Sequence, residues 1–305
     1  MLVAKQKGYF EAMCLSVAIV AGKSIADNYP RVGTNQAQFA TGDSFTEAVQ
    51  HNAANPSAAV DVVAVDGKTP LDVLVVKAGA AATVAALKGA TIGVDRAMPA
   101  SVAMMLQSAG LAESTDFHVA PLANTDATKN AALHDIAAFA ASKSDAPGDL
   151  DRAGVAYTLL DPSTSNVPGT FGVTYTNAVF LRDHPSAAQD FMRAAMQGLA
   201  DAIADPAAAA MIAVDFIDNG GSSASAITPD RETYRWQTEA KLITASTPKG
   251  EAVGMPDATV LHDEMNCDAM VGMYAGAPPD IAGDFDPSVL AAVYGADNRV
   301  IWPAK

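Results

Sequence analysis

The sequence is short of cysteine and of basic residues, and each shortage excludes a class of protein. Its two cysteines among 305 residues, Cys14 and Cys267, form neither a CxxC pair nor a Cys/His ladder, which argues against a disulfide scaffold and a structural zinc site. We expect both to be free, buried thiols. Lysine and arginine number 19 against 34 acidic residues, and the net charge of −15 disfavours nucleic acids and anionic membrane surfaces as partners.

Long apolar runs are also missing. The longest, at residues 17–21 and 207–214, fall short of the roughly 18–20 residues that span a bilayer. Residues 1–8 lack the basic and apolar regions of a signal peptide, so we expect a cytosolic protein or a mature or truncated chain. Apolar residues as such are abundant, at 50%. Together with the chain length, this predicts about two domains with well-filled cores.

Short β-branched runs alternate with alanine-rich helical stretches along the first half of the chain. The runs that predict strands cover residues 17–20, 60–65, 73–76, 91–94, 118–122 and 155–160. Most of them show no alternation of apolar and polar residues, which is typical of strands buried on both faces of a sheet. We therefore predict an α/β fold.

Helix signals complete this pattern. Residues 44–52 read as a helix with a capping box, with Ser44 at the N-cap and Glu47 three residues on. A second helix opens at Pro99 and is closed by Gly110. In the last third we expect helices over residues 184–205, 207–217 and 230–244, followed by a tail rich in proline and glycine.

Two stretches look like motifs, but one lacks an essential residue and the other lacks the required spacing. Residues 17–24 resemble a strand that runs into a P-loop, but Val17 stands where the Walker pattern needs glycine, so we expect a plain turn. The ligand-type residues at 262–267 do not follow the HExxH spacing, and a solvated acidic turn explains them better than a metal site. Since a GxSxG elbow is also missing, no nucleophile–base pair can be assembled from the sequence.

The turns between strands and helices remain as candidate sites. They cover residues 39–44, 94–99 and 121–126. In open α/β sheets, ligands collect outside the carboxyl ends of strands, where helix N-termini offer unpaired N–H donors. Most such turns only cap helices, but here they mark the place where we expect a ligand.

Several segments resemble one family. Residues 4–17 resemble the A-x-x-x-GYF-x-x-x-GL-x-V opening of periplasmic binding proteins that serve importers of nitrate, sulfonates, taurine and thiamine pyrimidine precursors. Residues 34–40 are similar to its sGqaqFa segment, 86–94 to its DLKGKtIGV segment and 184–206 to its nPe…FlrA…dP helix. A weaker similarity extends to residues 285–287 and 300–303.

The resemblance implies a two-lobed, type II Venus-flytrap fold with two hinge crossings. Lobe I would hold residues 1–77 plus 172–305 and lobe II residues 78–171, with the crossings at 71–77 and 171–177. Proteins of this family close on one small solute in the cleft between the lobes and pass it to an ABC permease without chemistry. We therefore expect a monomer that is not an enzyme, needs no cofactor or metal, and in its full-length form lies in the periplasm or on the cell surface as a lipoprotein.

Two departures from the family pattern concern the start of the chain. The family's first strand normally precedes the GYF helix, and here it is missing; Cys14 stands where the family usually has glycine. A truncated start is our interpretation. The runner-up function is an enzyme on the same fold, the synthase of the thiamine pyrimidine precursor, but its cysteine cluster has no counterpart at residues 166–172. A ligand-sensing regulator would need a DNA-binding extension, which this chain lacks.

The ligand-binding residues that the turns and the resemblance suggest are Thr41, Asp43, Ser44, Asp95, Arg96, Asn124 and Asn177. Asp43 and Asp95 would accept hydrogen bonds, Ser44 and Asn177 would form further ones, and Arg96 would act as a latch or counter-ion. Since carboxylates outnumber arginine, we expect a neutral or cationic nitrogen compound, such as a thiamine pyrimidine precursor, rather than a sulfonate or nitrate. Tyr175 and Trp236 are candidates to stack on a flat ligand, although packing explains both as well.

Overall fold

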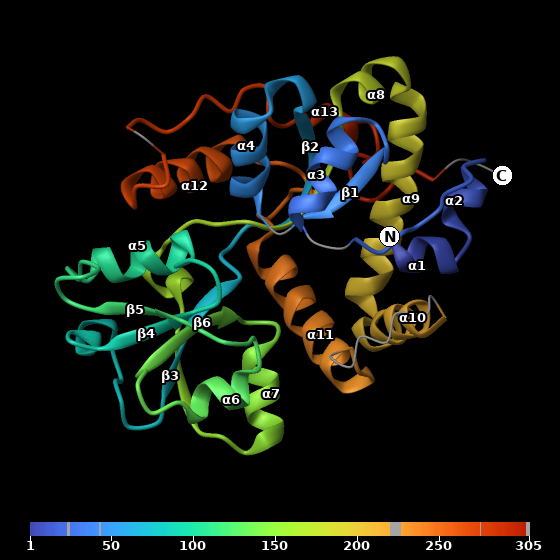
Figure 1. The fold of residues 1–305 in the computed structure, drawn as a ribbon. Coiled ribbons are helices and arrows are strands. Elements are labelled where there is room, and N and C mark those ends of the chain that lie inside the picture. Colours follow the sequence, from blue (N-terminus) through green and yellow to red (C-terminus); the bar gives the residue numbers. More distant parts are fainter. Residues whose placement is uncertain (23–24, 43, 220–226, 275, 303–305) are drawn as a thin grey trace. The chain divides into compact units, whose positions relative to one another are not determined.

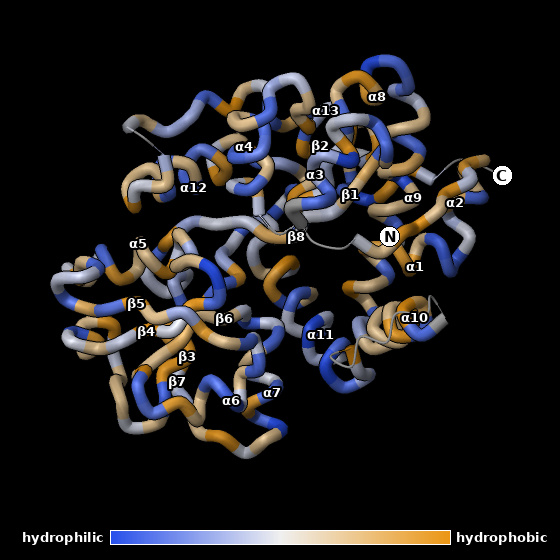
Figure 2. The backbone as a smooth tube through the Cα atoms, viewed as in Figure 1, coloured by the Kyte–Doolittle hydropathy of each residue, from blue (hydrophilic) through white to orange (hydrophobic). Residues whose placement is uncertain are grey.

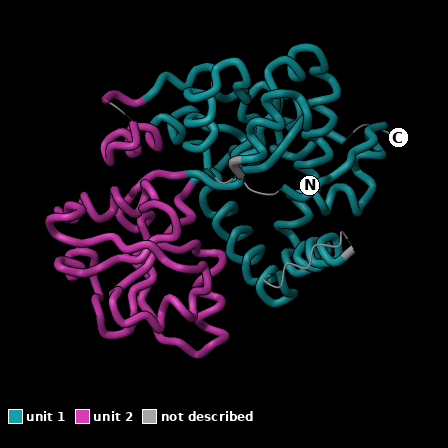
Figure 3. Tube along the Cα trace, viewed as in Figure 1, with its two compact units in different colours: residues 1–68, 170–262, 279–305 teal, residues 69–169, 263–278 magenta. Residues whose placement is uncertain are grey.

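The structure is a computed structural model that describes residues 1–22, 25–42, 44–219, 227–274 and 276–302. Contacts divide the chain into two compact units (Figure 3): unit 1 holds residues 1–68, 170–262 and 279–305, and unit 2 holds residues 69–169 and 263–278. The division into lobes expected from the family resemblance stays a prediction, and it assigns residues 263–278 to lobe I. Among the described residues, each unit contains one sheet.

The sheet of unit 1, sheet A, contains β1 (Phe39–Gly42), β2 (Val60–Gly67) and β8 (Phe171–Asn177) among the described residues. β8 lies between the other two strands and runs antiparallel to both. The carboxyl ends of β1 and β2 therefore lie at the same edge of the sheet as the start of β8. We call this the carboxyl edge of sheet A.

Helices surround sheet A in unit 1 (Figure 1), and most residues of this unit are helical. Their bounds are α1 (Leu2–Gln6), α2 (Tyr9–Ala12), α3 (Ile25–Gly33), α4 (Phe45–Ala54), α8 (Ala178–Asp183), α9 (Pro185–Ala204), α10 (Pro206–Asn219), α11 (Pro229–Ser246) and α13 (Ser288–Ala291). A short 3₁₀ turn, η1 (Pro56–Ala58), follows α4. On α9, Gly198 allows α1 to approach, because a Cβ there would lie 2.7 Å from the Cβ of Ala4.

The sheet of unit 2, sheet B, has the strand order β5-β4-β6-β3-β7. These strands are β3 (Asp72–Lys77), β4 (Thr91–Val94), β5 (His118–Pro121), β6 (Ala138–Ser142) and β7 (Tyr157–Leu160). β4 is parallel to β5 and β6, whereas β3 is antiparallel to β6 and β7. The helical segments of this unit are η2 (Val84–Leu87), α5 (Ala100–Ser108), α6 (Ala127–Ala132), α7 (Ala146–Ala153), η3 (Pro162–Ser165) and the later part of α12 (Ala258–Met270).

Strands β2, β3 and β4 are largely buried on both faces, as their sequence predicts, whereas β5 and β7 each have two exposed residues. Residues 73–76 of β3 have no exposed surface, and Figure 2 shows β3 in the orange of hydrophobic residues, whereas much of α11 is hydrophilic blue. The α/β prediction is confirmed, as are the strands predicted around residues 60–65, 73–76, 91–94, 118–122 and 155–160. The helices predicted from residues 99, 184 and 230 onward are confirmed as well.

The strand predicted at residues 17–20 is wrong. The chain is irregular there, Val20 is 69% exposed, and the carbonyl of Val17 accepts a hydrogen bond from Nζ of Lys5 at 2.6 Å. A β-branched run becomes a strand only where a partner strand takes up its backbone groups. The capping box is also wrong in detail, because α4 begins after Ser44 but the Ser44 side chain makes no capping hydrogen bond.

No helix in the described parts of the chain has both the length and the apolar character to cross a bilayer.

Candidate functional site

The carboxyl edge of sheet A gathers the ends of three chain segments. In the strand register, Gly42 of β1 and Val65 of β2 both pair with Val173, and Gly67 pairs with Phe171. The predicted residue Thr41 therefore lies at this edge, exposed, and Ser44 follows directly after it, partly buried. Asp43, also predicted, lies outside the described residues.

The N-terminus of α4 meets the same edge, and a different side chain caps it than the sequence suggests. The amide of Phe45 donates to the buried hydroxyl of Thr170, which lies immediately before β8, at 2.9 Å. Ser44 occupies the N-cap position in an extended conformation, with its hydroxyl not used for capping. At this helix terminus the Ser44 hydroxyl therefore caps none of the backbone amides of α4, and its role in binding stays a prediction.

Asp66, near the end of β2, is a candidate residue at this edge that was not predicted from the sequence. It is partly buried, and its Oδ1 atom is buried and accepts no hydrogen bond from the part of the chain that the structure describes. Burial raises the pKa of Asp66 to about 7; the charge of Glu239 adds to this rise, and the Met1 ammonium opposes it. The signal that could have identified it is the one that identified Asp95, an aspartate directly after a buried β-branched run.

In unit 2, the predicted residues lie at the carboxyl edge of sheet B. Val94 of β4 pairs with Pro121 of the parallel strand β5, so the segments that follow both strands start at the same edge. Asp95 and Arg96, which follow β4, are exposed and pair with each other at 3.6 Å between Oδ2 and Nε. Asn124, which follows β5, is also exposed, and its Oδ1 accepts from the amide of Asp126 at 2.9 Å.

Asn177 lies at the opposite edge of sheet A, where it pairs with Val60. Its Oδ1 accepts hydrogen bonds from the amides of Val179 at 2.8 Å and Phe180 at 3.2 Å, and its Nδ2 donates to the carbonyl of Gly33 at 2.7 Å. The side chain is buried and caps α8. The structure thus does not bring Asn177 together with Thr41 and Ser44.

The two aromatic candidates belong to packed cores of unit 1. The ring of Tyr175 has no exposed surface and stacks on Tyr29, with 4.4 Å between the ring centroids. Trp236 packs against the buried cluster of Val3, Ala202 and Ala209. Both rings therefore contribute to the core of the unit.

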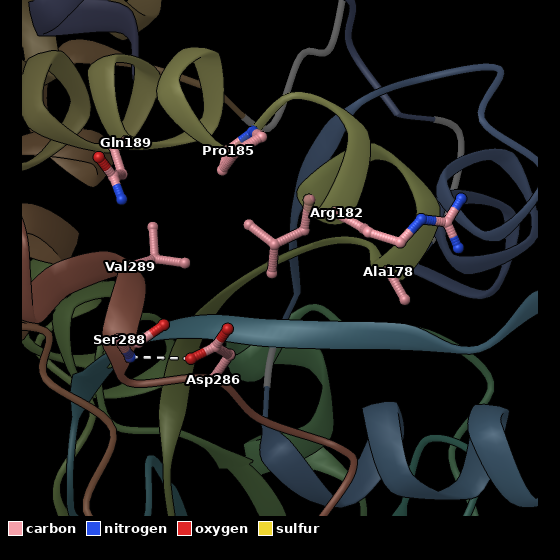
Figure 4. Close-up of a pocket in the computed structure, with 8 residues that line it drawn as sticks. Ala178, Arg182, Pro185, Gln189, Asp286, Ser288 and Val289 are labelled. Carbon is pink, nitrogen blue, oxygen red and sulfur yellow. Dashed lines mark hydrogen bonds between the residues drawn. The ribbon is translucent and has the colours of Figure 1, made fainter.

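A cavity of about 320 Å³ lies in unit 1 at the end of β8, beside Asn177. Its lining residues come from α8, α9, the start of α13 and the segment just before α13 (Figure 4): Ala178, Leu181, Arg182, Pro185, Gln189, Asp286, Ser288 and Val289. The Arg182 guanidinium points away from Asp286 and pairs with Asp183 at 2.8 Å. Asp286 accepts from the amide of Ser288 at 2.8 Å. Among the site residues predicted from sequence, none lines this cavity.

One of the two expectations about the cysteines is wrong. Cys14 is exposed, contrary to the expectation of two buried thiols, because it follows the short helix α2 in a left-handed conformation at the surface. Cys267 is buried in unit 2, and burial, together with the charges of Asp268 and Glu264, raises its pKa to about 12. Within the described ranges, no three His, Cys, Asp or Glu side chains come together as metal ligands.

Comparison with solved structures shows a periplasmic-binding-protein fold. The periplasmic sulfonate-binding protein SsuA from Methylobacillus flagellatus KT is 18% identical, with a TM-score of 0.67 over 95% of this chain and 86% of that one. The ligand-binding component of an ABC-type import system from Staphylococcus aureus, solved with zinc bound, is 12% identical, with a TM-score of 0.63 over 95% and 94%. The desulfurization enzyme DSZB, 11% identical with a TM-score of 0.66 over 95% and 94%, shares the fold.

Sequence comparison gives the family. No curated protein matches the chain. The family model described as NMT1/THI5 like matches residues 1–209, which is more than half of the sequence. The segments that the sequence analysis singled out at residues 4–17, 34–40 and 86–94 lie inside this match. The chain therefore belongs to the NMT1/THI5-like family.

Proposed function

We propose that this protein is the solute-binding component of an ABC importer, that it works in the periplasm or at the cell surface, and that it binds a small solute without changing it. The observation that carries the proposal is the placement of polar side chains at the carboxyl edge of each sheet. The fold shared with an ABC-type ligand-binding component and with a sulfonate-binding protein supports it. The permease of such an importer is the proposed partner, and the monomeric state stays a prediction.

Each unit holds some of the predicted binding residues. In unit 1, Thr41 and Ser44 offer hydroxyl groups, and the neighbouring Asp43 stays a predicted acceptor. In unit 2, Asp95 and Asn124 offer oxygen acceptors at exposed positions. Asn177 remains in the predicted set as well, although its amide already caps α8.

The charges at these edges favour a nitrogen compound over an oxyanion. A sulfonate or nitrate is best held by arginine or lysine together with N–H groups. The cation at the carboxyl edge of sheet B, Arg96, is paired with Asp95 at 3.6 Å, and the carboxyl edge of sheet A carries Asp66. A thiamine pyrimidine precursor has the N–H donors that these carboxylates accept, and an alkanesulfonate is the alternative that the names of similar proteins suggest.

A thermal-shift screen tests the proposal. The panel holds aminopyrimidines, thiamine, taurine, alkanesulfonates, nitrate and bicarbonate. A ligand at 100 times its Kd stabilises the folded protein by about 2.7 kcal/mol, which raises Tm by several degrees. We expect a shift from the aminopyrimidines, and cooperative melting without a shift from any compound would contradict the proposal.

A matched pair of variants separates site effects from general effects of charge. Arg96→Gln removes an exposed arginine at the proposed site, and Arg299→Gln removes one that is equally exposed and also next to an aspartate, 3.9 Å from Asp297. We expect the first to change the ligand-induced shift and the second to leave it unchanged.

An enzyme that consumes the solute is the second candidate, because DSZB shows that this fold also supports catalysis. A synthase of the thiamine pyrimidine precursor is the specific form of this alternative. Recovery of the bound compound unchanged after prolonged incubation, measured by mass spectrometry, supports a binding protein; its conversion supports the enzyme.

A further inference from the structure

We infer that Asp66 is a binding residue that accepts a cationic nitrogen group of the solute, an ammonium or an amidinium, at the carboxyl edge of sheet A. The inference rests on the proposed function and specifies its ligand: the solute carries a positive charge. Neither the turns between strands and helices nor the family resemblance pointed to this residue.

The carboxylate of Asp66 lies beside two glycines. Gly172 and Gly254 both have a positive φ, at +68° and +81°, a conformation that side chains rarely adopt. A Cβ at Gly172 would lie 3.2 Å from Oδ2 of Asp66, and one at Gly254 would lie 3.7 Å from Oδ1. The two neighbouring segments therefore bring backbone, and no side chain of their own, against the two carboxylate oxygens.

One oxygen of this carboxylate has an unused hydrogen-bonding capacity. Oδ1 is buried and has no partner in the described ranges, and an unpaired buried acceptor costs about 1–3 kcal/mol, more when it is charged. The Tyr294 hydroxyl, whose pKa burial and the Asp66 charge raise, donates instead to the carbonyl of Val253 at 2.7 Å. An N–H donor from a solute would satisfy Oδ1.

The charges that act on Asp66 favour a cation as that donor. Glu239 adds negative charge, which raises the pKa of Asp66 to about 7 together with burial. The Met1 ammonium is the opposing charge, and burial lowers its pKa. A bound ammonium or amidinium would stabilise the ionised Asp66, whereas a sulfonate would be repelled by both Asp66 and Glu239.

The same strand provides a matched control. Asp61 is also a partly buried aspartate of β2, with a pKa raised to about 6 by burial and by Asp286 and Asp284. It pairs with Thr176 near the opposite edge of sheet A, and at about 3.3 Å per residue it lies about 16 Å from Asp66 along the strand. Replacing Asp61 by Asn thus makes the same chemical change away from the proposed site.

Isothermal titration calorimetry of the wild type, Asp66→Asn and Asp61→Asn tests the inference with three probes: an aminopyrimidine with an aminomethyl group, benzamidine and methanesulfonate. At pH 8 we expect both cations to bind the wild type and Asp61→Asn with the same Kd. Asp66→Asn should bind them at least about tenfold more weakly, since a hydrogen bond to a charged group contributes about 1.5–3 kcal/mol.

A pH profile supplies a second readout. Benzamidine keeps its charge between pH 5.5 and 8, whereas Asp66, with its pKa near 7, gains a proton as the pH falls. Affinity of the wild type for benzamidine should therefore fall towards pH 5.5, and the profile of Asp66→Asn should be flat. A cooperative melt of Asp66→Asn shows that the variant is folded.

The outcomes separate this inference from the proposed function. Equal binding of the cations to the wild type and Asp66→Asn overturns the inference and leaves solute binding in place. Binding of methanesulfonate alone also overturns it, together with the preference for a nitrogen compound. Binding of none of the probes overturns the inference, and the wider thermal-shift panel then decides whether the chain binds a solute at all.

Discussion

The buried lysine of unit 2 gives the sharpest prediction about stability. Nζ of Lys143 lies 2.7 Å from Oδ1 of Asp161 and donates to the carbonyl of Pro70 at 2.8 Å, with 8% of its side chain exposed. It thereby joins the ends of β6 and β7 to the segment before β3. Lys143→Met keeps most of the volume of the side chain and removes the charge.

The expected loss follows from what the substitution leaves behind. Removing one partner of a fully buried ion pair costs about 3–5 kcal/mol. Asp161 retains 27% exposure and still accepts from the amide of Ser163 at 2.9 Å and from its hydroxyl at 2.7 Å, so its charge is partly compensated. We therefore expect a loss of about 2–3 kcal/mol, or about 10 °C in Tm for a unit of this size.

Urea unfolding combined with hydrogen exchange of peptides from residues 69–169 measures this loss in unit 2 itself. The control is Lys88→Met in the same unit, because Lys88 pairs with Asp116 at 3.0 Å but is 72% exposed, and we expect it to cost less than about 1 kcal/mol. If Lys143→Met is no more destabilising than this control, the reasoning from burial is wrong.

Three further predictions concern packing, pH and thiol chemistry. Gly67→Ala should destabilise unit 1 by about 2–3 kcal/mol in urea, because a Cβ would overlap the buried ring of Phe171. Asp66→Asn should stabilise the protein at pH 8 and not at pH 3.5. The raised pKa of Asp66 in the folded state stabilises the wild type fully below the unfolded value of 3.8, and this stabilisation is lost as the pH rises to about 7. The loss amounts to about 1.4 kcal/mol for each unit by which the pKa is raised. A thiol reagent should label one cysteine in the folded protein, the exposed Cys14, and both in denaturant, because Cys267 is buried.

Each of these measurements has a control. Gly283→Ala places a methyl group where no heavy atom lies within 4 Å, and it should change stability by less than about 0.5 kcal/mol; equal effects at both glycines would contradict the packing argument. Parallel pH profiles for the wild type and Asp66→Asn would contradict the raised pKa. Rapid labelling of both thiols in the native state would show that Cys267 is accessible.

The parts of the fold that could be predicted are those that depend on residues close together in the sequence. The apolar runs of β2, β3 and β4 predicted their own strands because burial on both faces needs unbroken apolar residues. The run at residues 17–20 has a similar composition, but no strand among the described residues pairs with it. β6, with the sequence Ala-Phe-Ala-Ala-Ser, has no β-branched residue and is a strand because its neighbours in sheet B pair with it.

The candidate site, too, could be predicted only where it depends on residues close together in the sequence. Asp95, Arg96 and Asn124 follow their strands directly, so the turns that hold them are visible in the sequence. The surroundings of Asp66 are not, because Gly172 and Gly254 reach it from segments far along the chain. A turn residue can thus be identified from its neighbours in sequence. The sequence also places Asp66 directly after a buried β-branched run, but the burial of its Oδ1 atom is visible only in the tertiary structure.

The position of β8 in sheet A has a consequence for biosynthesis. β1 and β2 do not pair with each other but with a strand whose residues, such as Thr176, leave the ribosome long after Phe39. Residues 69–169 of unit 2 are synthesised before β8, and residues 263–278, which bring Cys267 into the core of that unit, are synthesised after it. The first strands of unit 1 therefore wait with unpaired backbone groups until β8 emerges. Closing such a long loop slows folding and prolongs the exposure of unpaired strand edges. During translation, we expect binding of a chaperone to concentrate on residues 39–67, and to end when β8 emerges.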